Sequence, residues 1–284
     1  MDTNPGLTIW LTQWNWQPSL IVGTVVIIAL YIAMIGPLRV KYQLGPEVPL
    51  KQAAAFLIGV DLIFVALFSP LDAVGDTYLF TAHMIQHMIL AIFAPPLLLL
   101  GIPAWIFQLL LRNRFVFVVG KGLTQPLVSA FLFNANLWFW HAPLFYNATL
   151  ANPSLHIFSH LLYIATGLLF WWPILSPLSE GWPPLSLGGK IAYIFFSDMP
   201  MVLLGAGLTF TPSLYYRYQN APHLFGLSAD ADQQLGGLIM WIIGSIFLIV
   251  LVSIFFLSWM LQQEEKDRTR EGEEVIEESL DISH

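Results

Sequence analysis

Seven apolar runs, each near the length that a helix needs to cross a bilayer, constrain the fold of this chain more than any other feature. A spanning helix requires about 20 predominantly apolar residues. The runs cover residues 19–36, 51–69, 78–100, 124–140, 155–175, 189–210 and 235–260, and Gly and Pro residues separate most of them. We therefore expect an all-α, polytopic membrane helix bundle of about seven transmembrane helices embedded in the lipid bilayer.

Composition and charge support this class. Hydrophobic residues make up 57% of the 284 residues and charged residues 10%, whereas a soluble domain carries about 25% charged residues. Residues 262–284 hold nine acidic and three basic side chains, which is −6 of the net −7. The sequence thus predicts a transmembrane domain over 1–261 and a charged cytoplasmic tail over 262–284. Nothing in it resembles a nucleic-acid-binding surface, so we expect no nucleic-acid partner.

Basic residues predict the orientation in the membrane. With the N-terminus outside and seven alternating spans, ten of the eleven basic residues fall inside and only Arg217 falls outside. The inside set is Arg39, Lys41, Lys51, Arg112, Arg114, Lys121, Lys190, Lys266, Arg268 and Arg270. Segment 102–119 is apolar but contains Arg112 and Arg114, so we expect an amphipathic piece at the interface rather than an eighth span.

Six of the seven histidines fall on the outer side of this topology. They are His83 and His87 at the start of the third span, His141 at the end of the fourth, His156 and His160 at the start of the fifth, and His223 in the last outside loop. This topology rests on Lys and Arg alone, so the location of the histidines on one side is an independent observation. Polar residues inside a span are costly and typically face a cavity, a partner or a ligand.

Two pairs, His83/His87 and His156/His160, have the i, i+4 spacing that places both side chains on one face of a helix. Two imidazoles so placed can bind one metal ion. Neither pair is a zincin motif, because Met84 and Ile157 stand where the catalytic Glu would follow the first histidine. On the same side, Asp232 is expected to cap the last span or to act as an oxygen ligand or a partner of a histidine.

Several blocks then resemble a known family. They are His83-Met-Ile-Gln-His87, Ala94-Pro-Pro, Trp138-Phe-Trp-His141-Ala-Pro143, Leu155-His156 with His160, Phe170-Trp-Trp-Pro173 and Asp232-Gln-Gln-Leu-Gly-Gly237. In this order, over roughly residues 50–260, they resemble the CtaG family of multi-span bacterial cytochrome c oxidase assembly factors.

The resemblance implies a multi-pass protein of the bacterial plasma membrane that works with cytochrome c oxidase subunits, not an enzyme, and that helps to mature the copper centres. Carried over block by block, the expected metal ligands are His83, His87, His141, His156, His160 and Asp232. Copper is the expected ion and zinc the alternative. The chain has no cysteine, which departs from a thiol-based copper chaperone.

Three other interpretations stay open. The first is a membrane-embedded metal-dependent hydrolase, in which Asp61 or Asp72 and the histidine pairs would hold a zinc ion that activates water. The second is haem binding between histidines of facing helices. The third is a structural scaffold for oxidase subunits, in which the histidines only pack and pair.

Overall fold

The fold is helical throughout the part of the chain that the structure, a computed structural model, describes, namely residues 5–178, 181–222 and 224–281, where no strand occurs. The longer elements are α2 (Pro18–Ala33), α4 (Leu50–Phe68), α6 (Phe80–Met88), α7 (Ala94–Gly101), α10 (Pro126–His141), α12 (Pro153–Leu175), α13 (Leu187–Phe210), α15 (Ala229–Leu238) and α16 (Gly244–Asp281). The shorter ones are α1 (Pro5–Thr12), α3 (Arg39–Tyr42), α5 (Pro70–Thr77), α8 (Ala104–Leu111), α9 (Arg114–Leu123), α11 (Pro143–Ala151) and α14 (Tyr216–Gln219), together with a 3₁₀ turn at Leu224–Gly226.

Six of the predicted spans form helices that are long and apolar enough to cross a membrane, and the first of them is kinked at Gly36. They are Pro18–Tyr42, Leu50–Phe68, Phe80–Gly101, Pro153–Leu175, Leu187–Phe210 and Ala229–Gly272. Three of them contain a π-helical turn, at Met34–Leu38, Ile89–Phe93 and Ile239–Ile243, that joins two α-helical halves. The chain is therefore a multi-pass, all-α membrane protein, as the sequence predicts.

The fourth predicted span is the exception. Its helix α10 has 16 residues, and it reaches spanning length only together with α9, from which it is bent by 73°. The segment predicted to lie at the interface, 102–119, breaks into α8 and α9. Asn113 begins α9, because its side-chain oxygen accepts hydrogen bonds from the backbone N–H groups of Phe115 and Val116 at 2.9 and 3.3 Å.

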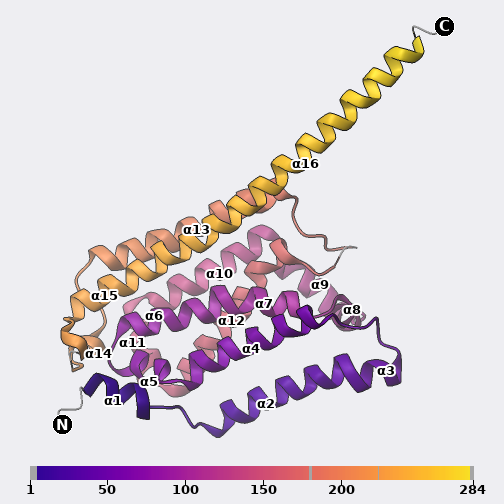
Figure 1. Ribbon diagram of the computed structural model, residues 1–284. Helices are drawn as coiled ribbons and strands as arrows, with labels where there is room; N and C mark the ends of the chain where they lie inside the picture. The colour runs from indigo at the N-terminus through magenta and orange to yellow at the C-terminus, as the bar shows by residue number, and fades with distance from the viewer. Residues whose placement is uncertain (1–4, 179–180, 223, 282–284) are drawn as a thin grey trace.

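The short helices gather at the two ends of the bundle (Figure 1). Helices α3, α8 and α9 lie at one end, and α1, α5, α11 and α14 lie at the other. Arg39, Lys41, Arg112 and Arg114 belong to the first end, which the charge count predicts to be cytoplasmic. The opposite end carries the beginnings of α6 and α12, where the histidine pairs lie. The orientation itself, with the N-terminus outside, stays a prediction.

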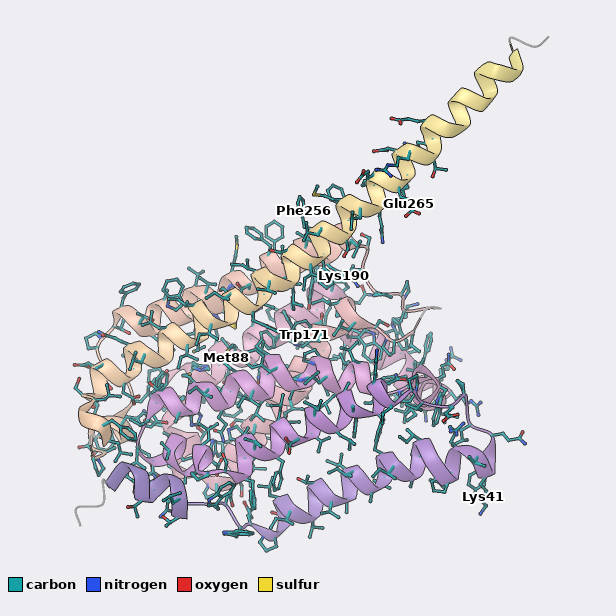
Figure 2. All side chains as sticks on the ribbon, viewed as in Figure 1. Lys41, Met88, Trp171, Lys190, Phe256 and Glu265 are labelled. Carbon is teal, nitrogen blue, oxygen red and sulfur yellow. The ribbon has the colours of Figure 1, made fainter. Side chains whose placement is uncertain are left out.

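Close helix contacts hold the site-bearing helices together. A Cβ atom at Gly101 of α7 would overlap the backbone of Phe56 in α4, and one at Gly167 of α12 would overlap the carbonyl oxygen of Ala91. Small residues allow helix backbones in a membrane to approach in this way. Trp171 and other large buried side chains of α12 fill the core between these helices (Figure 2).

The predicted tail continues the last span. Helix α16 passes without a break from the apolar region near Phe256 to the charged region near Glu265 and projects beyond the bundle (Figures 1 and 2). Within it Arg268 pairs with Glu264 one turn earlier, at 2.6 Å. The division into a domain over 1–261 and a tail over 262–284 stays a prediction.

Candidate metal centre

Side-chain caps fix the N-terminal ends of the two helices that carry the histidine pairs. Helix α12 begins with Pro153, and the side chain of Asn152 caps it by accepting hydrogen bonds from two backbone N–H groups at 3.0 and 3.2 Å. Helix α6 follows Leu79, which provides no side-chain cap. The carboxylate of Asp232, on α15, replaces that cap by accepting hydrogen bonds from the N–H groups of Phe80 and Thr81 at 2.6 and 3.0 Å.

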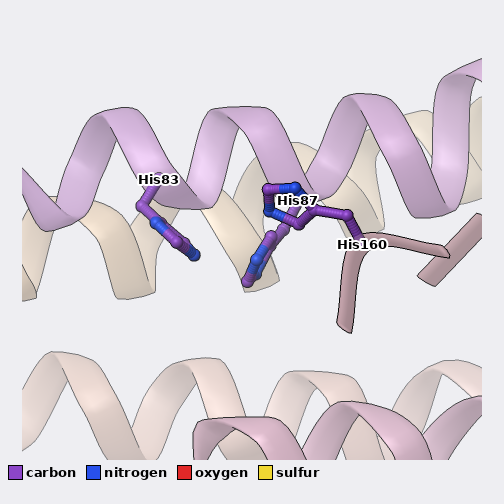
Figure 3. Close-up of side chains that lie close together, drawn as sticks. All are labelled: His83, His87 and His160. Carbon is purple, nitrogen blue, oxygen red and sulfur yellow. The ribbon is translucent and has the colours of Figure 1, made fainter. Parts of the chain in front are cut away.

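The first group of side chains is His83 and His87 of α6 with His160 of α12, which we call the imidazole triad. One nitrogen of each ring lies within 4.8 Å of the others, and Figure 3 shows the three rings close together between the helices. The ring centroids of His83 and His87 are 4.2 Å apart, and those of His87 and His160 are 5.6 Å apart. The two predicted pairs therefore converge.

The second group consists of Asp76 of α5, His83 and His156, which we call the carboxylate triad; it shares His83 with the first. The Asp76 carboxylate lies 3.1 Å from Nδ1 of His156 and 3.4 Å from Nδ1 of His83. Burial alone would raise the pKa of Asp76, but its close contacts with the imidazoles of His156 and His83 outweigh burial and lower it. This carboxyl group is therefore ionised near neutral pH.

The triad histidines are buried, and several of their nitrogens lack partners. Within the described residues, no hydrogen-bond partner lies at either ring nitrogen of His87, at Nε2 of His156 or at Nε2 of His160. An unpaired buried polar atom costs about 1–3 kcal/mol, and a native fold rarely leaves several side by side. Unpaired imidazole nitrogens are also the atoms that bind a metal, so the donor set fits a metal ion.

His141 and Asp232 lie near this cluster without belonging to either triad. Nδ1 of His141 lies 2.7 Å from the carbonyl oxygen of Leu137, and its Nε2 lies 3.4 Å from the sulfur of Met84. Both ring nitrogens of His141 thus have partners, as do both carboxylate oxygens of Asp232. The expectation that Asp232 caps the last span is wrong, because Ser228 caps α15 and Asp232 contacts α6 instead. Whether His141 or Asp232 binds metal stays a prediction. His223, which the sequence also placed outside, lies outside the described residues.

Asp61 and Asp72, the two carboxylates considered as zinc ligands of a hydrolase, lie in different surroundings. Asp61 is exposed on α4. Asp72 accepts hydrogen bonds from Asn15 and Gln86 at 2.9 and 2.7 Å. Burial and the nearby charge of Asp76 raise the pKa of Asp72 to about 6. The carboxylate beside the histidines is instead Asp76, to which the sequence assigned no role. Asp76 lies one turn after Asp72 on α5, but this spacing alone does not indicate that it lies beside the histidines.

The fold and this site define a class: a multi-pass membrane protein with a buried histidine cluster near one end of its bundle. The family model for the cytochrome c oxidase caa3 assembly factor matches residues 29–262, which include both triads. The chain belongs to this family, and the expected resemblance is confirmed.

Two mycobacterial proteins are similar to this chain in sequence, and their descriptions state no activity. An uncharacterized protein of Mycobacterium leprae is 27% identical over 91% of this chain, and one of Mycobacterium bovis is 28% identical over 92%. The chain spans 41% of the length of each of these two relatives. No solved structure matches the chain.

Proposed function

We propose that this protein assists the assembly of a haem-copper cytochrome c oxidase in the bacterial plasma membrane by holding copper at the imidazole triad. The family supports the role in oxidase assembly. One observation carries the copper proposal: three buried histidines from two helices bring nitrogens within 4.8 Å of one another. Two nitrogens bound to one ion at about 2.1 Å can be at most about 4.2 Å apart, so the rings would close on the ion by small side-chain rotations.

Charge favours monovalent copper at this triad. The three ligands are neutral imidazoles, so none of them would offset the charge of the bound ion in this buried part of the bundle. Burying charge without compensation is costly, and the cost grows with the charge. Cu(I) brings half the charge of Zn(II), and imidazole suits copper as well as zinc. The triad is therefore better matched to Cu(I) than to a divalent ion.

The depth of the triad suits lateral delivery. His83 and His87 lie within the first turns of a helix that is long enough to span the membrane, so in a bilayer they would lie between the surface and the centre. A donor at this depth could pass copper to an oxidase subunit beside it, exchanging imidazole ligands one at a time, and the ion would not cross hydrocarbon. Cytochrome c oxidase subunits are accordingly the proposed partners, and the role is one of transfer, not catalysis.

The test joins metal content to oxidase maturation. Purified wild-type protein loaded under reducing conditions should retain about one Cu(I) per chain, and His83→Ala should retain almost none. In cells that lack the native gene, the same variant should leave the oxidase short of copper. His284→Ala is the matched control, because it removes a histidine but no triad residue. Absence of copper from the wild type, or full oxidase maturation with His83→Ala, would refute the proposal.

A membrane-embedded metal hydrolase is the second candidate, and the carboxylate triad is the observation that favours it. A carboxylate and two imidazoles around a divalent ion form a set that can activate water. Zinc-loaded protein would then hydrolyse amide or ester bonds of a membrane lipid, and Asp76→Asn would abolish this activity. Full copper loading without hydrolysis of such lipids would instead favour the assembly role alone.

A further inference from the structure

A cavity of about 650 Å³ lies between α2, α4, α7 and α12, beside the histidine cluster. Its volume is within the range of sites that bind small molecules, about 300–1,000 Å³. Two triad histidines, His156 and His160, line it, whereas His83 and His87 do not. The cavity is thus a space next to the proposed copper site, and the metal proposal does not account for it.

The cavity opens on the lipid-facing surface of the bundle. Among its lining side chains, Ile27 of α2 is 49% exposed, and Ile157 and Leu161 of α12 are 47% and 59% exposed. All three belong to spans, so the solvent that reaches them there is hydrocarbon. A molecule that enters between α2 and α12 would therefore come from the bilayer.

Helix α2 is fixed at its two ends beside this opening. At one end the Tyr31 ring stacks on Phe56 with centroids 3.8 Å apart, and the Tyr31 hydroxyl donates to the carbonyl of Gly101 at 2.8 Å. At the other end the N–H group of Asn15, just before α2, donates to the carbonyl of Phe68 at 2.9 Å. Between these attachments Leu20, Gly23, Thr24 and Ile27 line the cavity. The wall that α2 contributes to the cavity is therefore attached to the rest of the bundle at both ends of the helix.

Polarity changes along the cavity. The walls toward α7 are aliphatic and include Val60, Leu98 and Leu168. The opposite end contains Asn15, Asp72, Asp76, His156 and His160, and Nε2 of each of these histidines is buried without a partner among the described residues. A ligand that matches this gradient has a hydrocarbon chain and a small polar head. The two carboxylates at the polar end disfavour an anionic head.

We propose that this cavity binds one alkyl chain of a membrane amphiphile whose uncharged, hydrogen-bonding head, a hydroxyl or an amide, lies against His156 and His160. A bound chain would fill the apolar walls, which otherwise forgo dispersion contacts. Its head would satisfy one or both unpaired imidazole nitrogens. The inference goes beyond the proposed copper function and needs no metal.

Photo-crosslinking of the full chain in lipid nanodiscs, stripped of metal by a chelator, tests this site. The probe is hexadecanol with a diazirine at the chain end. We expect crosslinks on cavity residues of α2, α4, α7 and α12, and competition by unlabelled hexadecanol. Palmitate should compete roughly tenfold more weakly, because its carboxylate meets Asp72 and Asp76. Equal competition by palmitate would overturn the assignment of the head group.

Two glycine variants sharpen the test. Gly23 lines the cavity, and a Cβ atom there meets nothing within 4 Å, so Gly23→Leu would occupy the site without a backbone clash. It should reduce cavity crosslinking by roughly tenfold. Gly207→Leu is the control, since Gly207 is exposed on α13 and equally open, and it should change nothing. Unreduced crosslinking with Gly23→Leu, or equal labelling of lipid-facing α13, would overturn the proposal. Because the crosslinking uses protein stripped of metal, its result does not depend on whether the protein binds copper.

Discussion

The imidazole triad and the carboxylate triad share His83, yet they offer an ion different surroundings. The imidazole triad contains only buried histidines, whereas the carboxylate triad adds Asp76, whose side chain is 28% exposed. An ion at the first site has no charged ligand, while an ion at the second is partly neutralised by a carboxylate ligand. Neighbouring sites that share one ligand can thus prefer ions of different charge. The following predictions test this difference, from the largest expected effect to the smallest.

The largest effect is expected from the double variant His87→Ala/His160→Ala. It removes both ligands that belong only to the imidazole triad and leaves the carboxylate triad complete. Loss of one outer-shell partner already costs about 10–100-fold in metal affinity, so loss of two ligands should lower Cu(I) affinity by more than about 1,000-fold. Zinc affinity should change by less than about threefold. Competition with a chromophoric Cu(I) chelator measures the Cu(I) affinity, and calorimetry measures the zinc affinity. Retained Cu(I) binding would show that copper does not occupy this triad.

His156→Ala is the converse variant, because His156 belongs only to the carboxylate triad. Zinc affinity should fall by about 100-fold or more, and Cu(I) affinity by less than about tenfold. Cu(I) chelator competition and zinc calorimetry measure the two affinities. If Cu(I) affinity fell more than zinc affinity, the assignment of ions to the two triads would have to be reversed.

Asp76→Asn should have an intermediate effect on copper. The carboxylate lies 3.4 Å from Nδ1 of His83 and helps to orient a ring that the imidazole triad uses. Its loss should lower Cu(I) affinity by about tenfold, as expected for an outer-shell partner. Asp72→Asn is the control, since Asp72 contacts Asn15 and Gln86 rather than a histidine. Equal effects of the two variants would argue for a general charge effect and against orientation.

Asp232→Ala should affect stability more than metal affinity. This carboxylate caps α6 from another helix, and loss of a cap costs about 0.5–2 kcal/mol. We expect a lower unfolding temperature in detergent, with Cu(I) affinity within about threefold of wild type. Asp230→Ala is the matched control, because Asp230 lies on the same helix but accepts from Ser213 in an exposed position. A selective loss of copper binding with normal stability would instead make Asp232 a ligand.

The sequence predicted the spans and the pairing of histidines within each helix for physical reasons, whereas the convergence of the two pairs is seen only in the structure. Long apolar runs must be helices in lipid, and i, i+4 spacing places His83 with His87 on one face. The role of Asp76 could not be predicted, because α5 is a short helix whose position depends on packing rather than on periodicity. The long-range cap from Asp232 to Phe80, 152 positions apart, leaves no local pattern either.

The π-helical turn at Ile89–Phe93 directly follows the α6 histidines. Such a turn contains one residue more than the α-helical turn that it replaces, so it can take up an insertion or a deletion. The two halves of the span can therefore diverge separately in evolution. The half that begins at Phe80 must conserve the four-residue interval between His83 and His87. The half that ends at Gly101 must conserve its fit against α4 and α12. Length changes among homologues should accordingly be concentrated at this turn and should be absent between the two histidines.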